Sequence, residues 1–181
     1  MNKIKFSLSR NFKSKSIQLF FNNVFTKSES KKEGKIVGDL SFKLAQIIDQ
    51  KEIIAIEIKI DDKIIAFIFL TKLNYNQNYS VYLLAPVAVD PNFQNKGLGK
   101  KIIKYAIKHL KTKKIDLLMT YGDPRYYSKI GFKKTTVSIV PAPFKLSQPI
   151  GWLMNKISSK KLPKLAKKPE CVLPFRNKKL W

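Results

Sequence analysis

The segment from Asp90 to Lys101 contains the residue types and spacing that best support chemistry. Two glycines, Gly97 and Gly99, stand where a buried strand should give way to an amphipathic helix. The first turn of a helix has unpaired N–H groups and a partial positive charge, and glycine lets a ligand approach the backbone closely. The segment therefore predicts a site for an anion such as a phosphate group.

The charges around this turn also favour an anion. The chain has no Asp or Glu from Gln94 to Ile115. The expected first turn contains Lys96, Lys100 and Lys101. A cation at a helix N-terminus interacts unfavourably with the helix dipole, at a cost of roughly 0.3–1 kcal/mol each. A bound pyrophosphate would make the same lysines favourable, because they would then lie beside an anion. The alternative is a glycine-rich turn that binds nothing.

Other phosphate-binding motifs fit this segment less well. A P-loop needs Gly at position 94 and Ser or Thr at position 101, where the chain has Gln94 and Lys101. A dinucleotide-binding fingerprint needs a third glycine at position 102, where Ile102 stands.

Cysteine and histidine are too scarce for several kinds of site. Cys171 is the only cysteine and His109 the only histidine, so the chain forms neither an intrachain disulfide nor a zinc site of His and Cys ligands. We expect Cys171 to be buried and His109 to lie on the surface or in packing contacts. No metal is expected.

The formal net charge of +24 favours polyanionic partners: nucleic acid, an anionic membrane surface or phosphate-bearing small molecules. Lysine is nevertheless spread over the whole chain beside abundant Ile and Asn, as an AT-rich genome would impose. The charge alone does not decide among these explanations.

The length of 181 residues fits one domain. Apolar stretches such as 64–70 are far shorter than the roughly 18 residues of a membrane helix. The best apolar stretch near the N-terminus, 17–21, is broken by Gln18, so we expect no secretory signal. We therefore expect a soluble, cytoplasmic protein.

Hydrophobic periodicity predicts two helices followed by three strands, and then helices that alternate with strands. The expected helices span 14–25, 37–48 and 98–110, with a short one within 122–130, and the expected strands span 52–60, 64–70, 82–89, 115–120 and 135–140. Strand 52–60 should bury one face and form a hairpin with 64–70, and the helical crossover should make 115–120 parallel to 82–89. Residues 27–35 are expected to be a charged connector, and 156–168 either a solvated connector, which we favour, or an amphipathic helix.

Three motifs follow one another along the chain: Leu84-Ala85-Pro86-Val87-Ala88-Val89-Asp90-Pro91, Gln94-x-x-Gly97-x-Gly99 and Gly122-Asp123-Pro124-x-Tyr126-Tyr127-x-x-Ile130-Gly131-Phe132. In this order they resemble the GNAT superfamily of N-acetyltransferases, and within it a branch of bacterial predicted N-acetyltransferases. The resemblance is strongest over about 52–133.

This resemblance implies an α/β (α+β) fold with a mixed, mostly antiparallel sheet flanked by helices. Its central parallel strands, 82–89 and 115–120, would splay apart around the cofactor. Pro86 has no N–H, so a bulge or break is expected there as well. Residues 1–145 would form the acetyltransferase domain, and 146–181 a basic, Pro- and Lys-rich extension packed on it.

The family's co-substrate is acetyl-CoA. The resemblance implies that the backbone at Val87, Ala88 and Val89 pairs with pantetheine and polarises the thioester carbonyl. The pyrophosphate would then bind at Gln94, Asn95, Lys96, Gly97, Leu98, Gly99 and Lys100.

The family often uses a tyrosine four residues before the Gly-Phe pair to protonate the departing thiolate, and here that position is Tyr127. Tyr126 is the adjacent alternative. Many relatives have an Asn-x-x-Ala stretch before this tyrosine, where this chain has Gly122-Asp123-Pro124. Several also have a glutamate on the strand corresponding to 82–89, which this chain lacks. We assign no general base and leave these carboxylates open: Glu29, Glu33, Asp39 and Glu57.

The sequence thus predicts transfer of an acetyl group from acetyl-CoA to a primary amine by direct attack in a ternary complex. A basic nucleic-acid-binding module and a non-catalytic CoA-binding domain are the alternatives. The acceptor, a small molecule or a peptide, stays open, as does homodimerisation.

Overall fold

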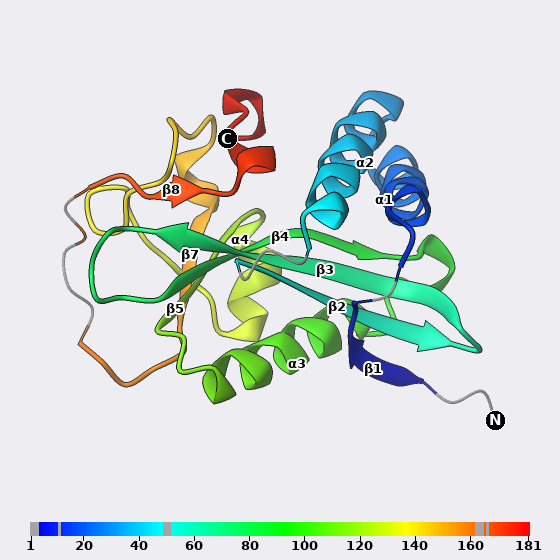
Figure 1. Ribbon diagram of the computed structural model, residues 1–181, viewed down its shortest axis with the longest axis horizontal. Coiled ribbons are helices and arrows are strands. Elements are labelled where there is room, and N and C mark those ends of the chain that lie inside the picture. Colours follow the sequence, from blue (N-terminus) through cyan, green and yellow to red (C-terminus); the bar gives the residue numbers. More distant parts are fainter. Residues whose placement is uncertain (1–3, 11, 49–51, 162–164, 166) are drawn as a thin grey trace. The chain divides into compact units, whose positions relative to one another are not determined.

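A computed structural model describes residues 4–10, 12–48, 52–161, 165 and 167–181. The fold is mixed α/β, as expected, with mostly antiparallel strands (Figure 1). Its α-helices are α1 (Ser14–Ser28), α2 (Lys31–Gln46), α3 (Leu98–Thr112) and α4 (Pro124–Tyr127). Its strands are β1 (Lys5–Leu8), β2 (Ile53–Ile60), β3 (Lys63–Asn74), β4 (Val81–Val89), β5 (Leu117–Tyr121), β6 (Lys133–Lys134), β7 (Trp152–Lys156) and β8 (Glu170–Cys171).

The chain divides into two compact units. Unit one comprises residues 1–70 and 86–105, and unit two comprises residues 71–85 and 106–181. Strands β3 and β4 and helix α3 contribute residues to both units.

In unit one, β1 pairs antiparallel with β2, and β2 neighbours β3. Asp61 and Asp62 connect β2 to β3 with φ angles of 47° and 63°, the left-handed conformation that two-residue hairpin turns require. The hairpin predicted from the sequence is therefore formed. Phe21 of α1 packs against Phe67 and Phe69 of β3, with ring centroids 6.0 and 5.9 Å away.

Strand β2 is buried on both faces, which corrects the expectation of one buried face. Ile56 and Ile58 are buried as predicted, but Ala55 and Glu57 on the other face are buried too. The Glu57 carboxylate accepts a 2.6 Å hydrogen bond from the Ser9 hydroxyl and forms a 2.9 Å ion pair with Lys59. The alternation of apolar and polar residues did not reveal that the second face of β2 is buried as well.

Helix α2 begins at Lys31, six residues before the predicted start. Ser30 caps it by accepting a 3.1 Å hydrogen bond from the Glu33 N–H. Gly34 lies inside α2, on the side where α1 runs beside it (Figure 1). A Cβ at this position would lie 2.8 Å from the Asn22 carbonyl oxygen of α1, so there is no room for a side chain. The glycine that suggested a connector therefore permits close helix packing.

In unit two, β4 and β5 are parallel as predicted, with pairs from Val81↔Leu117 to Leu83↔Met119. Strand β7 lies between β5 and β6 and is antiparallel to both. Strand β8 pairs with the end of β3. The sequence pattern predicted none of the strands β7, β8 and, in unit one, β1.

The predicted strand 135–140 is not formed. Only Lys133 and Lys134 pair as β6, and the N–H groups of Ile139 and Val140 both bond to the Thr136 carbonyl in a turn. Within 156–168, Lys156 ends β7, and the other described residues, 157–161, 165, 167 and 168, are not helical. Residues 162–164 and 166, on which the rest of this prediction falls, lie outside the described residues.

Candidate functional site

The anion site predicted after β4 is anchored at the strand end. Asp90 is buried, and its N–H donates to the Ile65 carbonyl oxygen of β3 at 2.8 Å. Its carboxylate accepts a 2.9 Å hydrogen bond from the Asn92 N–H, which caps the short 3-10 helix η1 (Pro91–Phe93). Proline is well suited to the first position of such a turn because its φ is already fixed. The following loop therefore starts from a fixed point.

The loop between η1 and α3 exposes its backbone. Asn95 and Gly97 have left-handed φ angles of 59° and 75°, and no atom lies within 4 Å of where a Cβ on Gly97 would stand. Residues 94–97 are exposed, whereas Leu98 and Gly99 are buried. The Lys101 N–H donates to the Gly97 carbonyl at 3.0 Å, which is the first hydrogen bond of the helix. The N–H groups of the residues just before Lys101 therefore have no acceptor within the helix. This turn can receive an anion.

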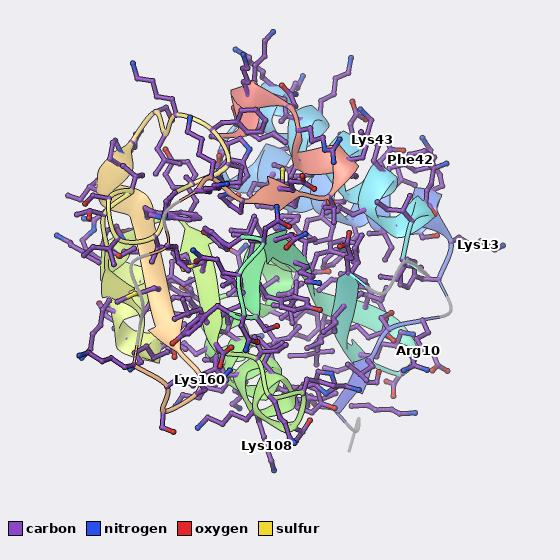
Figure 2. All side chains as sticks on the ribbon, turned by 60° about the vertical axis from the view of Figure 1, so that its left-hand side comes forward. Arg10, Lys13, Phe42, Lys43, Lys108 and Lys160 are labelled. Carbon is purple, nitrogen blue, oxygen red and sulfur yellow. The ribbon has the colours of Figure 1, made fainter. Side chains whose placement is uncertain are left out.

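The lysines of this segment differ in their surroundings. Lys96 is held on the loop, with its Nζ 5.2 Å from the Phe93 ring centroid and 3.1 Å from the Asn92 carbonyl oxygen. Lys100 is exposed in the first turn of α3. Lys108, two turns further along α3, projects away from the helix into solvent (Figure 2). Lys108 therefore provides an internal control for charge changes at Lys100.

The hydrogen-bonding direction of β4 reverses along the strand. The Ser80 and Leu84 carbonyls accept bonds from Leu117 and Thr120, so even-numbered residues face β5 in the first half. At the other end, the N–H of even-numbered Asp90 faces β3. Because successive residues of a strand point to opposite sides, one extra residue must be accommodated between Leu84 and Asp90. Pro86, where the sequence predicts a bulge, lies in this interval.

Because Asp90 faces β3, the preceding residue Val89 faces the other side of the strand. Val87 and Val89 are half-buried, and Ala88 between them is buried. The Val89 carbonyl accepts a 3.1 Å hydrogen bond from the Gln94 side-chain amide. The sequence did not show this bond, which ties the signature glutamine to the strand. Unit one contains all the predicted coenzyme-binding residues, namely Val87, Ala88, Val89 and residues 94–100.

Tyr127, the predicted acid, is at the end of α4 in unit two. The Asp123 carboxylate caps this short helix by accepting a 2.8 Å bond from the Arg125 N–H. The Tyr127 ring meets Tyr126 and Phe132 nearly edge-on, with centroids 5.1 and 5.4 Å away.

Gly122 lies against the same ring. A Cβ on Gly122 would be 2.7 Å from Cε2 of Tyr127. A side chain at position 122 would therefore collide with the Tyr127 ring, and glycine is needed there. The position of Gly122 in the motif did not reveal this contact.

Burial raises the pKa of Tyr127 to about 12, a hydrogen bond with Thr120 lowers it in part, and Tyr126 adds a small rise. The phenol therefore keeps its proton throughout the neutral range. It is in the state in which a tyrosine can act as a proton donor.

The carboxylates left open as bases are mostly engaged elsewhere. Glu57 has the partners described above, and Asp39 accepts a 2.7 Å bond from the Gln18 amide. Burial raises the pKa of Glu29, with Glu33 as a second cause. Nothing singles out a general base among them.

The remaining candidates carry no chemistry. Cys171 is buried as expected, and burial raises the pKa of its thiol, which disfavours a reactive thiolate. Among the described side chains no group of three or more His, Cys, Asp or Glu is placed to hold a metal ion. The helices in the described ranges are all too short or too polar to cross a membrane.

Comparison with known proteins finds similarity to one family in the central part of the chain. Residues 49–134 match the model of the family described as an acetyltransferase (GNAT) domain. Over 128 residues the chain is 23% identical to a protein of Escherichia coli strain K12 described as the uncharacterized N-acetyltransferase YjhQ. That match covers 67% of this chain and 71% of the relative.

Solved structures give the same fold. A GNAT family N-acetyltransferase (YhbS) from Escherichia coli in complex with CoA matches with a TM-score of 0.77 at 15% identity, covering 98% of this chain and 94% of the other. A GNAT family acetyltransferase from Brucella melitensis in complex with acetyl-CoA matches with a TM-score of 0.65 at 18% identity, covering 94% and 96%.

Proposed function

We propose that this chain is an acyltransferase of the GNAT superfamily and that it transfers the acetyl group of acetyl-CoA to a primary amine by direct attack in a ternary complex. The observation that carries this proposal is the exposed turn at the start of α3, where left-handed Asn95 and Gly97 present backbone N–H groups amid lysines. The complexes of the two structural relatives with CoA and acetyl-CoA support this choice of donor.

The residues of unit one fit a coenzyme with a diphosphate and a long amide arm. The backbone at Val87 and Val89 would bond to the pantetheine amides, as an added strand pairs with a sheet edge, and buried Ala88 would keep the backbone in place. The diphosphate would bind the N–H groups and lysines of Gln94, Asn95, Lys96, Gly97, Leu98, Gly99 and Lys100.

The chemistry requires an activated acyl group, which acetyl-CoA would supply as a thioester. A new C–N bond forms as the C–S bond breaks. We assign Tyr127 the family's role of proton donor: its phenol proton goes to the sulfur, and the proton lost by the amine returns to the phenolate through solvent. Such proton transfer contributes typically about 10²–10⁴ in rate.

Charge reversal on α3 tests the coenzyme site. Lys100→Glu puts a carboxylate on the first turn, and we expect it to weaken acetyl-CoA binding about 10- to 100-fold in calorimetric titration. Lys108→Glu makes the same charge change on the same helix about 12 Å further along, beyond the screening length of roughly 8 Å at physiological salt. Equal affinity in the two variants would remove the first turn of α3 from the site.

The activity itself is tested by following thiol release from acetyl-CoA with a panel of small-molecule and peptide amines. Binding with thiol release supports the proposal. Binding without release would favour a non-catalytic CoA-binding domain, in keeping with the missing strand glutamate. Neither binding nor release would favour a nucleic-acid-binding module that uses the charge of +24.

A further inference from the structure

The excess positive charge lies mostly in the second half of the chain. Residues 91–181 contain 22 Lys and Arg but only 3 Asp and Glu, whereas residues 1–90 contain 14 and 9. A codon bias toward lysine would raise the number of lysines in both halves, but it would not remove acidic residues from one of them. Such an asymmetry between halves is typical of a chain that contacts a polyanion.

Two stretches of unit two that are distant in sequence meet around Asp116. This residue lies between α3 and β5, and its carbonyl accepts hydrogen bonds from the Ile157 and Ser158 N–H groups at 2.9 and 3.3 Å. At the next position, Leu117 of β5 pairs with Lys156 of β7. The end of α3 and the stretch that follows β7 therefore lie side by side, and both belong to unit two.

Six exposed lysines come from these two stretches, and we call them the lysine cluster: Lys111, Lys113, Lys114, Lys156, Lys160 and Lys161. Lys160, labelled in Figure 2, binds the Asp116 carboxylate with its Nζ 3.1 Å from each oxygen. That carboxylate is buried and also accepts hydrogen bonds from the Ser80 N–H and the Ser158 hydroxyl. Among the described side chains, none of the other five lysines forms an ion pair with a carboxylate. The cluster therefore presents uncompensated positive charge to the solvent.

Stabilisation of α3 explains only part of the cluster. Lys111 lies in the last turn, where a cation interacts favourably with the helix dipole, but this effect does not reach beyond that turn. It does not account for Lys156 and Lys161, which come from another part of the chain. Lys114 has a left-handed φ of 55° just after the helix, where glycine is the usual residue and another residue costs roughly 1–2 kcal/mol. The cluster is therefore not a by-product of helix stability.

The chemistry of the surrounding surface favours a nucleic acid over a membrane. A protein that binds a membrane surface normally inserts exposed apolar side chains, yet Ile115 and Ile157, the large apolar residues within these stretches, are buried. The exposed neighbours of the lysines include the hydroxyl side chains of Thr112 and Ser159. Lysine and hydroxyl side chains are the groups that contact nucleic-acid phosphates.

We propose that the lysine cluster binds the phosphate backbone of a nucleic acid without reading its sequence. The phosphodiester is common to RNA and DNA, and each lysine would neutralise one phosphate. This inference goes beyond the proposed function and does not depend on it, since the residues proposed to bind the coenzyme belong to unit one and the cluster to unit two.

The salt dependence of binding tests the proposal. The full chain is titrated into a short fluorescent DNA duplex, and into an RNA duplex and an RNA single strand of the same sequence, with anisotropy as the readout. Five lysines free of ion pairs predict a slope of about −4 to −5 in a plot of log affinity against log salt for the DNA duplex. The affinity should therefore fall about 500-fold between 50 and 200 mM salt. The three titrations identify which nucleic acid binds best.

A multiple variant locates the binding surface. Together, Lys111→Gln, Lys113→Gln, Lys156→Gln and Lys161→Gln should reduce the slope to about −1 and weaken binding at 50 mM salt by about 100-fold or more. Thiol release and the melting temperature should stay close to those of the parent. The matched control makes the same charge change at four exposed lysines of unit one: Lys27, Lys31, Lys32 and Lys35. An equal loss of affinity in the control would overturn the proposal, because binding would then follow net charge alone.

Lys114→Gly separates charge from folding. Glycine adopts the left-handed conformation readily, so the melting temperature should not fall, while the slope should become shallower by about 1 because one phosphate contact is lost. A slope equal to that of the parent would count against the proposal.

Two further titrations distinguish the cluster from other anion sites. Saturating acetyl-CoA should leave nucleic-acid binding unchanged, and displacement by acetyl-CoA would overturn the proposal by placing the phosphates at the first turn of α3. Binding to vesicles of phosphatidylcholine and phosphatidylglycerol, with no binding to any of the nucleic acids, would overturn it in favour of a membrane surface. Absence of thiol release with intact nucleic-acid binding would count against the proposed function and leave this inference standing.

Discussion

Gly122→Ala is the sharpest test of how the structure holds Tyr127. The added Cβ would lie 2.7 Å from Cε2 of the tyrosine ring, whereas carbon atoms in contact are about 3.5–4.0 Å apart. The ring must therefore move by about 1 Å. A displacement of that size at a reacting group lowers rates by about 100-fold, and overpacking of this kind destabilises a protein by typically 1–3 kcal/mol.

The expected result is a kcat lowered by about 100-fold with an unchanged Kd for acetyl-CoA, since the residues proposed to bind the coenzyme are not altered. Steady-state thiol release gives kcat, and calorimetry gives the Kd. Gly38→Ala in α2 is a matched control, because its Cβ would lie 3.1 Å from the Gln18 carbonyl and it should affect stability alone. In a Tyr127→Phe background, Gly122→Ala should lower stability again but leave kcat as it is.

Two outcomes would refute this reasoning. A Gly122→Ala enzyme with the parent kcat would show that the position of the Tyr127 ring does not limit the reaction. An equal fall in kcat for Gly38→Ala would show that activity merely follows stability.

Two further predictions concern stability. Gly34→Ala should lower the free energy of unfolding by about 1–3 kcal/mol in chemical denaturation, because the added Cβ would lie 2.8 Å from the Asn22 carbonyl; a stabilised variant would contradict the close packing of α1 and α2. For Asp116, burial alone would raise its pKa, but hydrogen bonds from the Ser80 N–H and from Ser158 and Lys160 leave the pKa lowered. Its contribution to stability should therefore be complete above the unfolded pKa near 3.9 and be lost as the pH falls through the lower folded value, so melting temperatures of the parent and of an Asp116→Asn variant should converge at acid pH.

Much of the fold follows from local patterns. The apolar stripe of α3 is buried as its spacing predicts, and a crossover helix makes β5 parallel to β4. The turn at Asp61 and Asp62 also has a purely local cause. The segment proposed to bind the diphosphate could be singled out for the same reason, since its glycines and lysines lie close together in sequence.

What the sequence missed depends on distant partners. Gly34 suggests a connector until α1 is known to lie against it, and residues 135–140 resemble a strand until Thr136 is seen to close a turn. Strand β7 has no alternating pattern, because it is covered by elements from elsewhere in the chain.

Several expectations stay predictions. They include the boundary at residue 145, the site residues, homodimerisation, the cytoplasmic location and the acceptor amine.

The interleaving of the two units restricts how this protein can be divided. The chain passes from one unit to the other after residues 70, 85 and 105, so any single cut leaves at least one unit without part of its chain. The stretch proposed to bind the diphosphate belongs to unit one, yet in the gene it lies between the two stretches that encode unit two. Recombination at one breakpoint therefore cannot exchange the proposed coenzyme site alone.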